Sequence, residues 1–171
     1  VLFLVGWFAS GGDAPDYGAS DQDWTAWADD NQWKSRIGAF AMLLAGFAFL
    51  YFAATIRTAL GGAETTAGGS AQLARAAFAG AITGMAGMAM AIVMISSANT
   101  EGADANPIVT RAVTHASAGP FLLSAMGFAA FLMASGLVTL GTGVFARWMR
   151  VVALIGAVSF LVAFAAVLSG L

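Results

Sequence analysis

The sequence predicts an all-α, polytopic transmembrane helical bundle, because its composition and its charge placement fit a chain surrounded by lipid. Of its 171 residues, 60% are hydrophobic and only 9% are charged, and the mean hydropathy is +0.83. A soluble domain carries about 25% charged residues to cover its water-facing surface. Here the charges separate long uncharged stretches, each able to cross about 30 Å of hydrocarbon as a helix. We therefore expect a single transmembrane domain over residues 1–171.

The uncharged stretches predict five membrane spans. The chain opens inside an apolar run, residues 1–9, which as a helix rises only about 14 Å. We interpret this run as the end of a truncated first helix rather than the remnant of a signal peptide, because it lacks a small-x-small cleavage pattern. The predicted spans cover approximately residues 1–9, 37–56, 76–97, 112–140 and 151–171.

Residues 10–36 form a long acidic segment rich in tryptophan. Ser20 precedes several acidic residues, as an N-cap does, so we expect a short amphipathic helix on the membrane surface with its indoles at headgroup depth. A solvated acidic face fits the segment better than a calcium site, because the EF-hand spacing is missing. Its candidates for docking a partner are Asp21, Asp23, Trp24, Trp27, Asp29, Asp30 and Trp33.

Small residues and methionines characterise the span predicted over residues 76–97. Ala76, Gly80 and Gly84 are spaced as a small-xxx-small stripe, which lets another helix approach closely, either in this chain or in a partner. The methionines of this span do not converge on one face, so we interpret them as packing residues rather than a Cu(I) site.

The span predicted over residues 112–140 has a polar outer end. Asn106 and Pro107 are typical of an N-cap followed by a first-turn proline. We expect a bend near Pro120, whose ring removes a backbone hydrogen bond. Side chains at this end are candidates for binding an anionic head group, sensing pH or transferring a proton: Arg111, Thr114, His115 and Ser117. The simpler interpretation, which we prefer, is an interfacial turn whose arginine reaches phosphates while the histidine bonds a neighbouring loop.

Charges also suggest an orientation and a duplication. Glu64 is the only acid on one side of the predicted spans, where four arginines lie, whereas eight acids and three basic residues lie on the other. We place the acidic segment, residues 10–36, outside the cell. The motifs Phe40…Gly46-Phe47-Ala48 and Phe121…Gly127-Phe128-Ala129 indicate a tandem repeat of two helical hairpins.

Several function classes are disfavoured. The chain has no cysteine and one histidine, so we predict no metal, no cofactor and no catalytic residue. No ionisable residue lies in the core of a complete span, where pumps and ion-coupled carriers place them. A net charge of −2 provides no basic patch for nucleic acid.

The chain resembles uncharacterised small multi-pass membrane proteins of actinobacterial type. The resemblance implies a bacterial plasma-membrane location, assigns no activity and transfers no functional residue. It rests on Asp16-Tyr17-Gly18-Ala19-Ser20-Asp21, Trp24, Trp27, Asp30-Asn31, Trp33, Ser35-Arg36-Ile37-Gly38-Ala39-Phe40 and Ala146-Arg147-Trp148-Met149.

Two functions follow from these features. The first is a non-catalytic accessory or assembly subunit that packs in the bilayer against other membrane chains or against its own copies, through the small-residue stripe and the acidic segment. The alternative is a carrier or binding protein for a lipid or another apolar small molecule. It would use the bundle interior, with the outer end at Arg111 and His115 holding a polar head.

Overall fold

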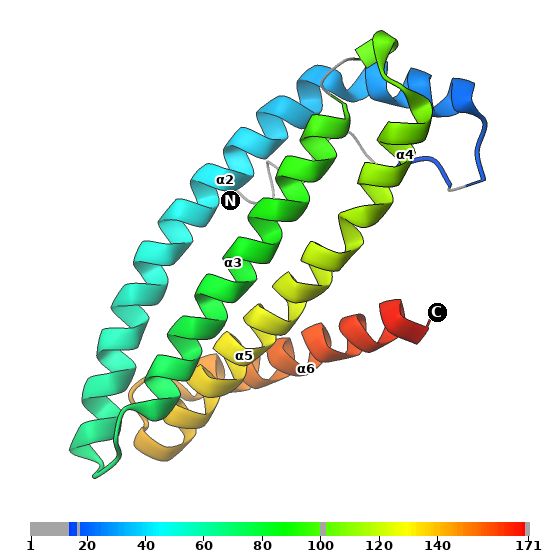
Figure 1. Ribbon diagram of the computed structural model, residues 1–171. Helices are drawn as coiled ribbons and strands as arrows, with labels where there is room; N and C mark the ends of the chain where they lie inside the picture. Colours follow the sequence, from blue (N-terminus) through cyan, green and yellow to red (C-terminus); the bar gives the residue numbers. More distant parts are fainter. Residues whose placement is uncertain (1–13, 17, 100–101, 170–171) are drawn as a thin grey trace. The chain divides into compact units, whose positions relative to one another are not determined.

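In the part that the computed structural model describes, residues 14–16, 18–99 and 102–169, the chain is helical and contains no strand (Figure 1). Ala103 and residues 167–169 are described by their backbone alone. The all-α prediction is confirmed. The elements are α2 (Asp21–Thr66), α3 (Gln72–Ala98), the short 3-10 helix η1 (Gly102–Asp104), α4 (Pro107–Ala116), α5 (Ala118–Thr142) and α6 (Arg147–Ser169).

Four helical segments of the described part are long and apolar enough to cross a membrane, which fits a multi-pass membrane protein. They are Asp21–Thr66, Gln72–Ala98, Pro107–Thr142 and Arg147–Ala166. The span predicted over residues 1–9 lies outside the described residues, so a fifth span stays a prediction. The tandem repeat also stays a prediction.

Helix α2 runs without interruption through the segment that was predicted to be a surface loop with its own short helix. Its start is the predicted cap: the Ser20 hydroxyl accepts from the Asp23 backbone N–H at 3.2 Å, and the Ser20 backbone N–H donates to the Asp23 carboxylate at 3.1 Å. No proline interrupts the chain from Asp21 to Thr66, so nothing forces the helix to end at its charged residues. Residues 21–36 are therefore helical and continuous with the span that follows.

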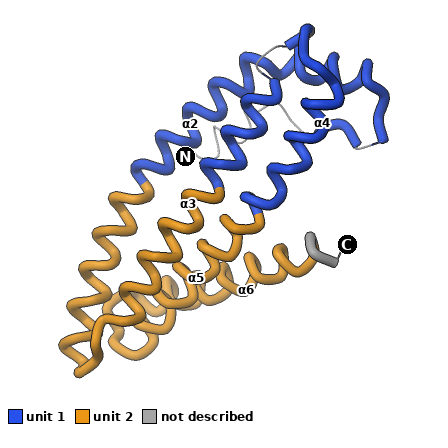
Figure 2. Tube along the Cα trace, viewed as in Figure 1, with its two compact units in different colours: residues 1–48, 88–121 blue, residues 49–87, 122–171 orange. Residues whose placement is uncertain are grey.

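The chain divides into two compact units (Figure 2): unit 1 consists of residues 1–48 and 88–121, and unit 2 of residues 49–87 and 122–171. The core of unit 2 is built from α2, α3 and α5. Phe49 on α2 lies edge-on to Phe128 and Phe131 of α5, with ring centroids 5.5 Å apart in each pair. The buried residues of this hydrophobic core are Ala53, Leu60, Ala74, Ala77, Ala81, Phe131, Ala134 and Val138.

Glycines bring α3 and α5 into backbone contact within unit 2. A Cβ on Gly80 would lie 2.6 Å from the Phe131 backbone N, and one on Gly84 would lie 2.9 Å from the Phe128 ring. Gly80 and Gly84 of the predicted small-residue stripe therefore allow another helix to approach closely, and this helix is α5 of the same chain. Ala76 is exposed, whereas its neighbour Ala77 is 1% exposed and belongs to the core.

The connection between α2 and α3 is short, because α2 extends to Thr66, well beyond residue 56, where the predicted span ends. Gly68 has a φ of +85°, a left-handed conformation that suits glycine and turns the chain. The Glu64 carboxylate then accepts from the backbone N–H groups of Leu73 at 3.3 Å and Ala74 at 3.1 Å. Glu64 thus satisfies donors of the first turn of α3, where a negative charge is favourable.

Helix α4 begins at Pro107 as predicted, after Asn106, whose side-chain oxygen accepts from the Ile108 and Val109 backbone N–H groups. The interruption between α4 and α5 falls at Ser117, three residues before Pro120. Proline has no N–H to donate to the carbonyl four residues earlier, which accounts for a break at this place.

Helix α6 makes few contacts within unit 2. Only 6% of its most apolar stretch of 18 residues is buried. Among the described residues of α6, Ala157 is the one that is fully buried, at 0% exposed. Phe160 lies 5.8 Å from Phe128 of α5, measured between ring centroids, and a Cβ on Gly156 would touch Leu132. Large apolar side chains of α6 such as Val152, Ile155 and Val162 are more than half exposed, as a lipid-facing helix requires.

Candidate functional site

The clearest gathering of polar and aromatic side chains within unit 1 lies where α2 meets α4. We call it the α2–α4 cluster and define it as Trp24, Trp27, Arg111, Thr114 and His115. Trp24 is fully buried at its centre. Its ring centroid lies 5.7 Å from that of Trp27 in an edge-on arrangement, and 5.9 Å from that of the His115 imidazole.

Arg111 ties the start of α2 to α4. Its Nη2 donates to the Ala19 carbonyl at 2.9 Å and to the Asp21 carboxylate at 3.0 Å, and its guanidinium carbon lies 5.9 Å from the centre of the Trp24 ring. The Asp21 side chain is 64% exposed, so solvent screens the ion pair, and its direct contribution to stability is small. The pair mainly positions Arg111 and leaves the cluster nearly neutral in charge.

Several buried hydrogen-bonding atoms of the cluster have no partner among the described residues, including Trp24 Nε1, Trp27 Nε1 and Thr114 Oγ1. An indole N–H can only donate, and a hydroxyl can donate as well as accept. Buried polar groups are nearly always hydrogen-bonded, because an unsatisfied one costs about 1–3 kcal/mol. The cluster is therefore suited to a hydrogen-bond acceptor.

The other predicted residues at this end have defined places. Ser117 is buried and donates to the Thr114 carbonyl at 2.6 Å, so its hydroxyl serves the turn between α4 and α5. His115 is exposed, with its ring against Trp24. The prediction that His115 bonds a neighbouring loop stays a prediction.

The residues predicted to dock a partner separate into two groups. Asp21 and Trp24 contact Arg111 and His115 of α4. Trp27 lies edge-on to Trp24 on α2, and Asp23 caps α2. Trp24 is buried by protein, so its indole packs within the protein, and the predicted headgroup depth of the segment stays a prediction. The remaining side chains are exposed and available to solvent or to a partner: Asp29, Asp30 and Trp33.

A second polar contact in unit 1 was not predicted. Asn99, fully buried at the end of α3, donates from Nδ2 to the Ser35 hydroxyl at 2.9 Å. The Thr110 hydroxyl of α4 donates to the Ala98 carbonyl at 3.2 Å. One signal was present in the sequence: the residues Trp24, Ala28, Asn31 and Ser35 fall on a single face of a helix and are all buried.

The described residues contain no group of three or more His, Cys, Asp or Glu side chains that could hold a metal ion. Comparisons with protein-family models, with curated proteins and with solved structures found no match. The resemblance to actinobacterial membrane proteins therefore stays a prediction.

Proposed function

We propose that the protein is a non-enzymatic binding protein of a bacterial plasma membrane, which holds a lipid or a similar apolar molecule by its polar head at the α2–α4 cluster. The observation that carries this proposal is the burial of the Trp24 and Trp27 indole N–H groups and of the Thr114 hydroxyl without a partner among the described residues. Because indoles only donate, the bound atom is an acceptor, such as an ester carbonyl or a phosphate oxygen.

The surroundings of the cluster suit an amphiphilic ligand. The Arg111–Asp21 ion pair keeps the site close to neutral, which favours ester carbonyls or a zwitterionic head over a multiply charged anion. On the first turn of α4, the side chains of Ile108 and Val109 are 67% and 56% exposed. Apolar surface therefore borders the polar end, and an acyl chain can lie against it.

The proposal is tested by removing single hydrogen-bonding groups through conservative substitutions. Thr114→Val deletes only the hydroxyl, and Trp27→Phe deletes the N–H while keeping an aromatic ring. Each lost bond is worth about 0.5–1.5 kcal/mol, so we expect roughly two- to tenfold weaker binding. The measurement is the amount of lipid retained after purification in mild detergent, together with a tryptophan-fluorescence titration with short-chain phosphatidylcholine.

Thr55→Val is the matched control, because the Thr55 hydroxyl is exposed and bonds only the Tyr51 carbonyl of its own helix. Equal lipid retention by wild type, Thr114→Val and Trp27→Phe would contradict the proposal. Arg111→Ala is less informative, because Arg111 also holds Ala19 and Asp21 in place.

The second candidate is an accessory subunit that packs against other membrane chains or against its own copies. It is favoured by α6, because only 6% of the most apolar stretch of this helix is buried within the protein. The small-residue stripe no longer supports it, because Gly80 and Gly84 contact α5 of the same chain. We expect native mass spectrometry from mild detergent to show a larger complex or a homo-oligomer, and a strictly monomeric particle would rule this candidate out.

A further inference from the structure

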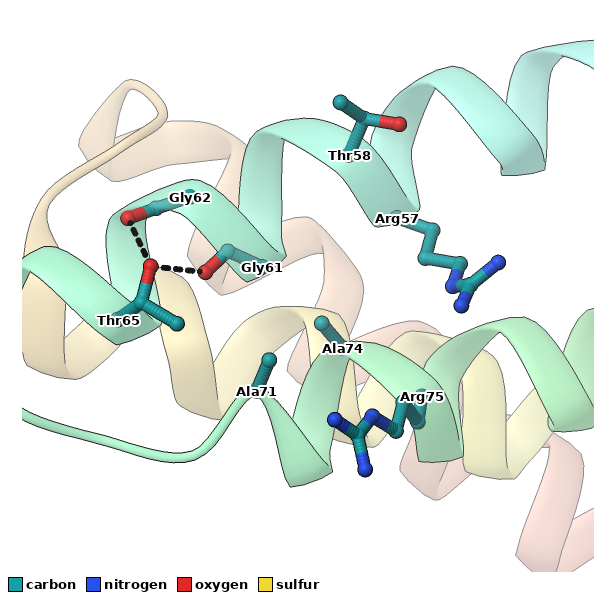
Figure 3. Close-up of a pocket in the computed structure, with 8 residues that line it drawn as sticks. All are labelled: Arg57, Thr58, Gly61, Gly62, Thr65, Ala71, Ala74 and Arg75. Atoms are coloured by element: carbon teal, nitrogen blue, oxygen red, sulfur yellow. Dashed lines mark hydrogen bonds between the residues drawn. The ribbon is translucent and has the colours of Figure 1, made fainter.

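A separate pocket of about 400 Å³ lies within unit 2, between α2 and α3 (Figure 3). It shares no residue with the α2–α4 cluster. Ala71, which directly precedes α3, and Ala74 of α3 project toward α2, and Arg57 reaches from α2 toward α3. Its lining residues are Arg57, Thr58, Gly61, Gly62, Thr65, Ala71, Ala74 and Arg75.

The polar side chains that line this pocket leave it positively charged. The Thr65 hydroxyl lies 2.9 Å from the Gly61 carbonyl and 3.0 Å from that of Gly62, and the Thr58 hydroxyl bonds the Ala54 carbonyl at 3.1 Å. Both hydroxyls thus serve their own helix. The charged groups of the lining are the guanidinium groups of Arg57 and Arg75, and neither forms an ion pair or a hydrogen bond with a described residue.

Nearby acids do not neutralise these arginines. Glu64 is the only Asp or Glu between residues 49 and 99. Its two carboxylate oxygens accept from the Leu73 and Ala74 backbone N–H groups at the start of α3. The Arg57 guanidinium carbon lies 5.2 Å from the centre of the Phe78 ring, a cation–π contact that positions the side chain without removing its charge.

Small residues leave room beside these charges. A Cβ on Gly62 would meet nothing within 4 Å, and one on Gly61 would be 3.7 Å from the Ala74 Cβ. An arginine fork matches two oxygens of a phosphate, and its hydrogen bonds to such an anion are stronger than neutral ones. We infer that the pocket between Arg57 and Arg75 binds a phosphate group, supplied by an anionic phospholipid or by a soluble phosphate compound.

The test uses the full chain reconstituted in phosphatidylcholine nanodiscs with two probes. The first is phosphatidylglycerol, with its retention measured by native mass spectrometry, and the second is inorganic phosphate, with its binding measured by phosphorus NMR. Arg57→Gln and Arg75→Gln should each weaken binding of the active probe at least tenfold. Gly62→Leu should weaken it as well, because it fills the space while leaving both charges in place.

Arg147→Gln is the matched control, because it removes an exposed arginine of unit 2 that does not line the pocket. Binding of phosphatidylglycerol alone identifies a lipid site, and binding of inorganic phosphate identifies a site for soluble compounds; both support the inference. It is overturned if wild type binds neither probe, or if Arg147→Gln weakens binding as much as the pocket variants do. Thr114→Val should leave this binding unchanged, which separates it from the function proposed for unit 1.

Discussion

At the scale of the residue, Gly80 and Gly127 show how tightly α3 and α5 approach in unit 2. A Cβ on Gly80 would lie 2.6 Å from the Phe131 backbone N and 2.7 Å from the Gly127 carbonyl oxygen. These atoms belong to a helix backbone, so they cannot yield as a flexible side chain would. In a membrane, where apolar side chains gain little by leaving lipid, such close backbone packing is a main source of helix association.

Gly80→Ala should therefore lower the free energy of unfolding by about 1–3 kcal/mol, the usual cost of overpacking. Gly141→Ala is a control of opposite sign. A Cβ on Gly141, which lies in α5, would meet nothing within 4 Å, and alanine favours a helix by about 0.5–1 kcal/mol over glycine. Denaturant unfolding in detergent micelles, followed by circular dichroism, measures both changes. Gly80→Ala unfolding at the same denaturant concentration as wild type would contradict the close approach.

At the scale of the element, the sequence predicted the signals that act over a few residues. The caps at Ser20 and Asn106 depend on hydrogen bonds to backbone N–H groups two or three residues away, so their residue types identify them. The start of α4 at Pro107 belongs to the same class. Such features can be predicted because both partners are neighbours in the chain.

Contacts between elements were predicted less completely. The stripe on α3 was identified, but its buried position is Ala77 rather than Ala76, because the facing helix sets which residues of a small-residue-rich helix are covered. The Ser35–Asn99 hydrogen bond joins residues 64 positions apart, and no local pattern pairs them. The length of α2 was missed because charged residues end an apolar stretch without ending a helix.

Within unit 1, the continuity of α2 changes what the acidic segment does. As a loop, residues 21–36 were expected to present their indoles to the membrane surface. As part of a helix, they place Trp24 and Ser35 on a buried face while Asp29 and Asp30 stay exposed. The candidate site therefore depends on the length of the helix as much as on the residues themselves.

At the scale of the whole molecule, the exposed surface is the strongest sign of a lipid environment. Tyr51 is 78% exposed, Phe40 71% and Phe47 67%, and many further large apolar side chains are more than a third exposed. A soluble protein rarely leaves so much apolar surface in contact with water. Four candidate spans in the described part, together with the uneven distribution of acids, then make the topology testable.

We predict that Asp29 lies outside the cell, whereas the α2–α3 connection and the α5–α6 connection both lie inside. The chain has no cysteine, so single cysteines can be introduced without a competing thiol. Asp29→Cys, Ser70→Cys and Ala146→Cys alter residues that are all exposed. In intact cells, a membrane-impermeant maleimide should label only Asp29→Cys, and the other two should react after permeabilisation. Two candidate spans, α3 and Pro107–Thr142, separate these two positions, so an arrangement with four spans requires Ser70 and Ala146 to share one side. Different accessibility of these two would contradict the four spans, whereas a complete reversal of the labelling would contradict only the orientation.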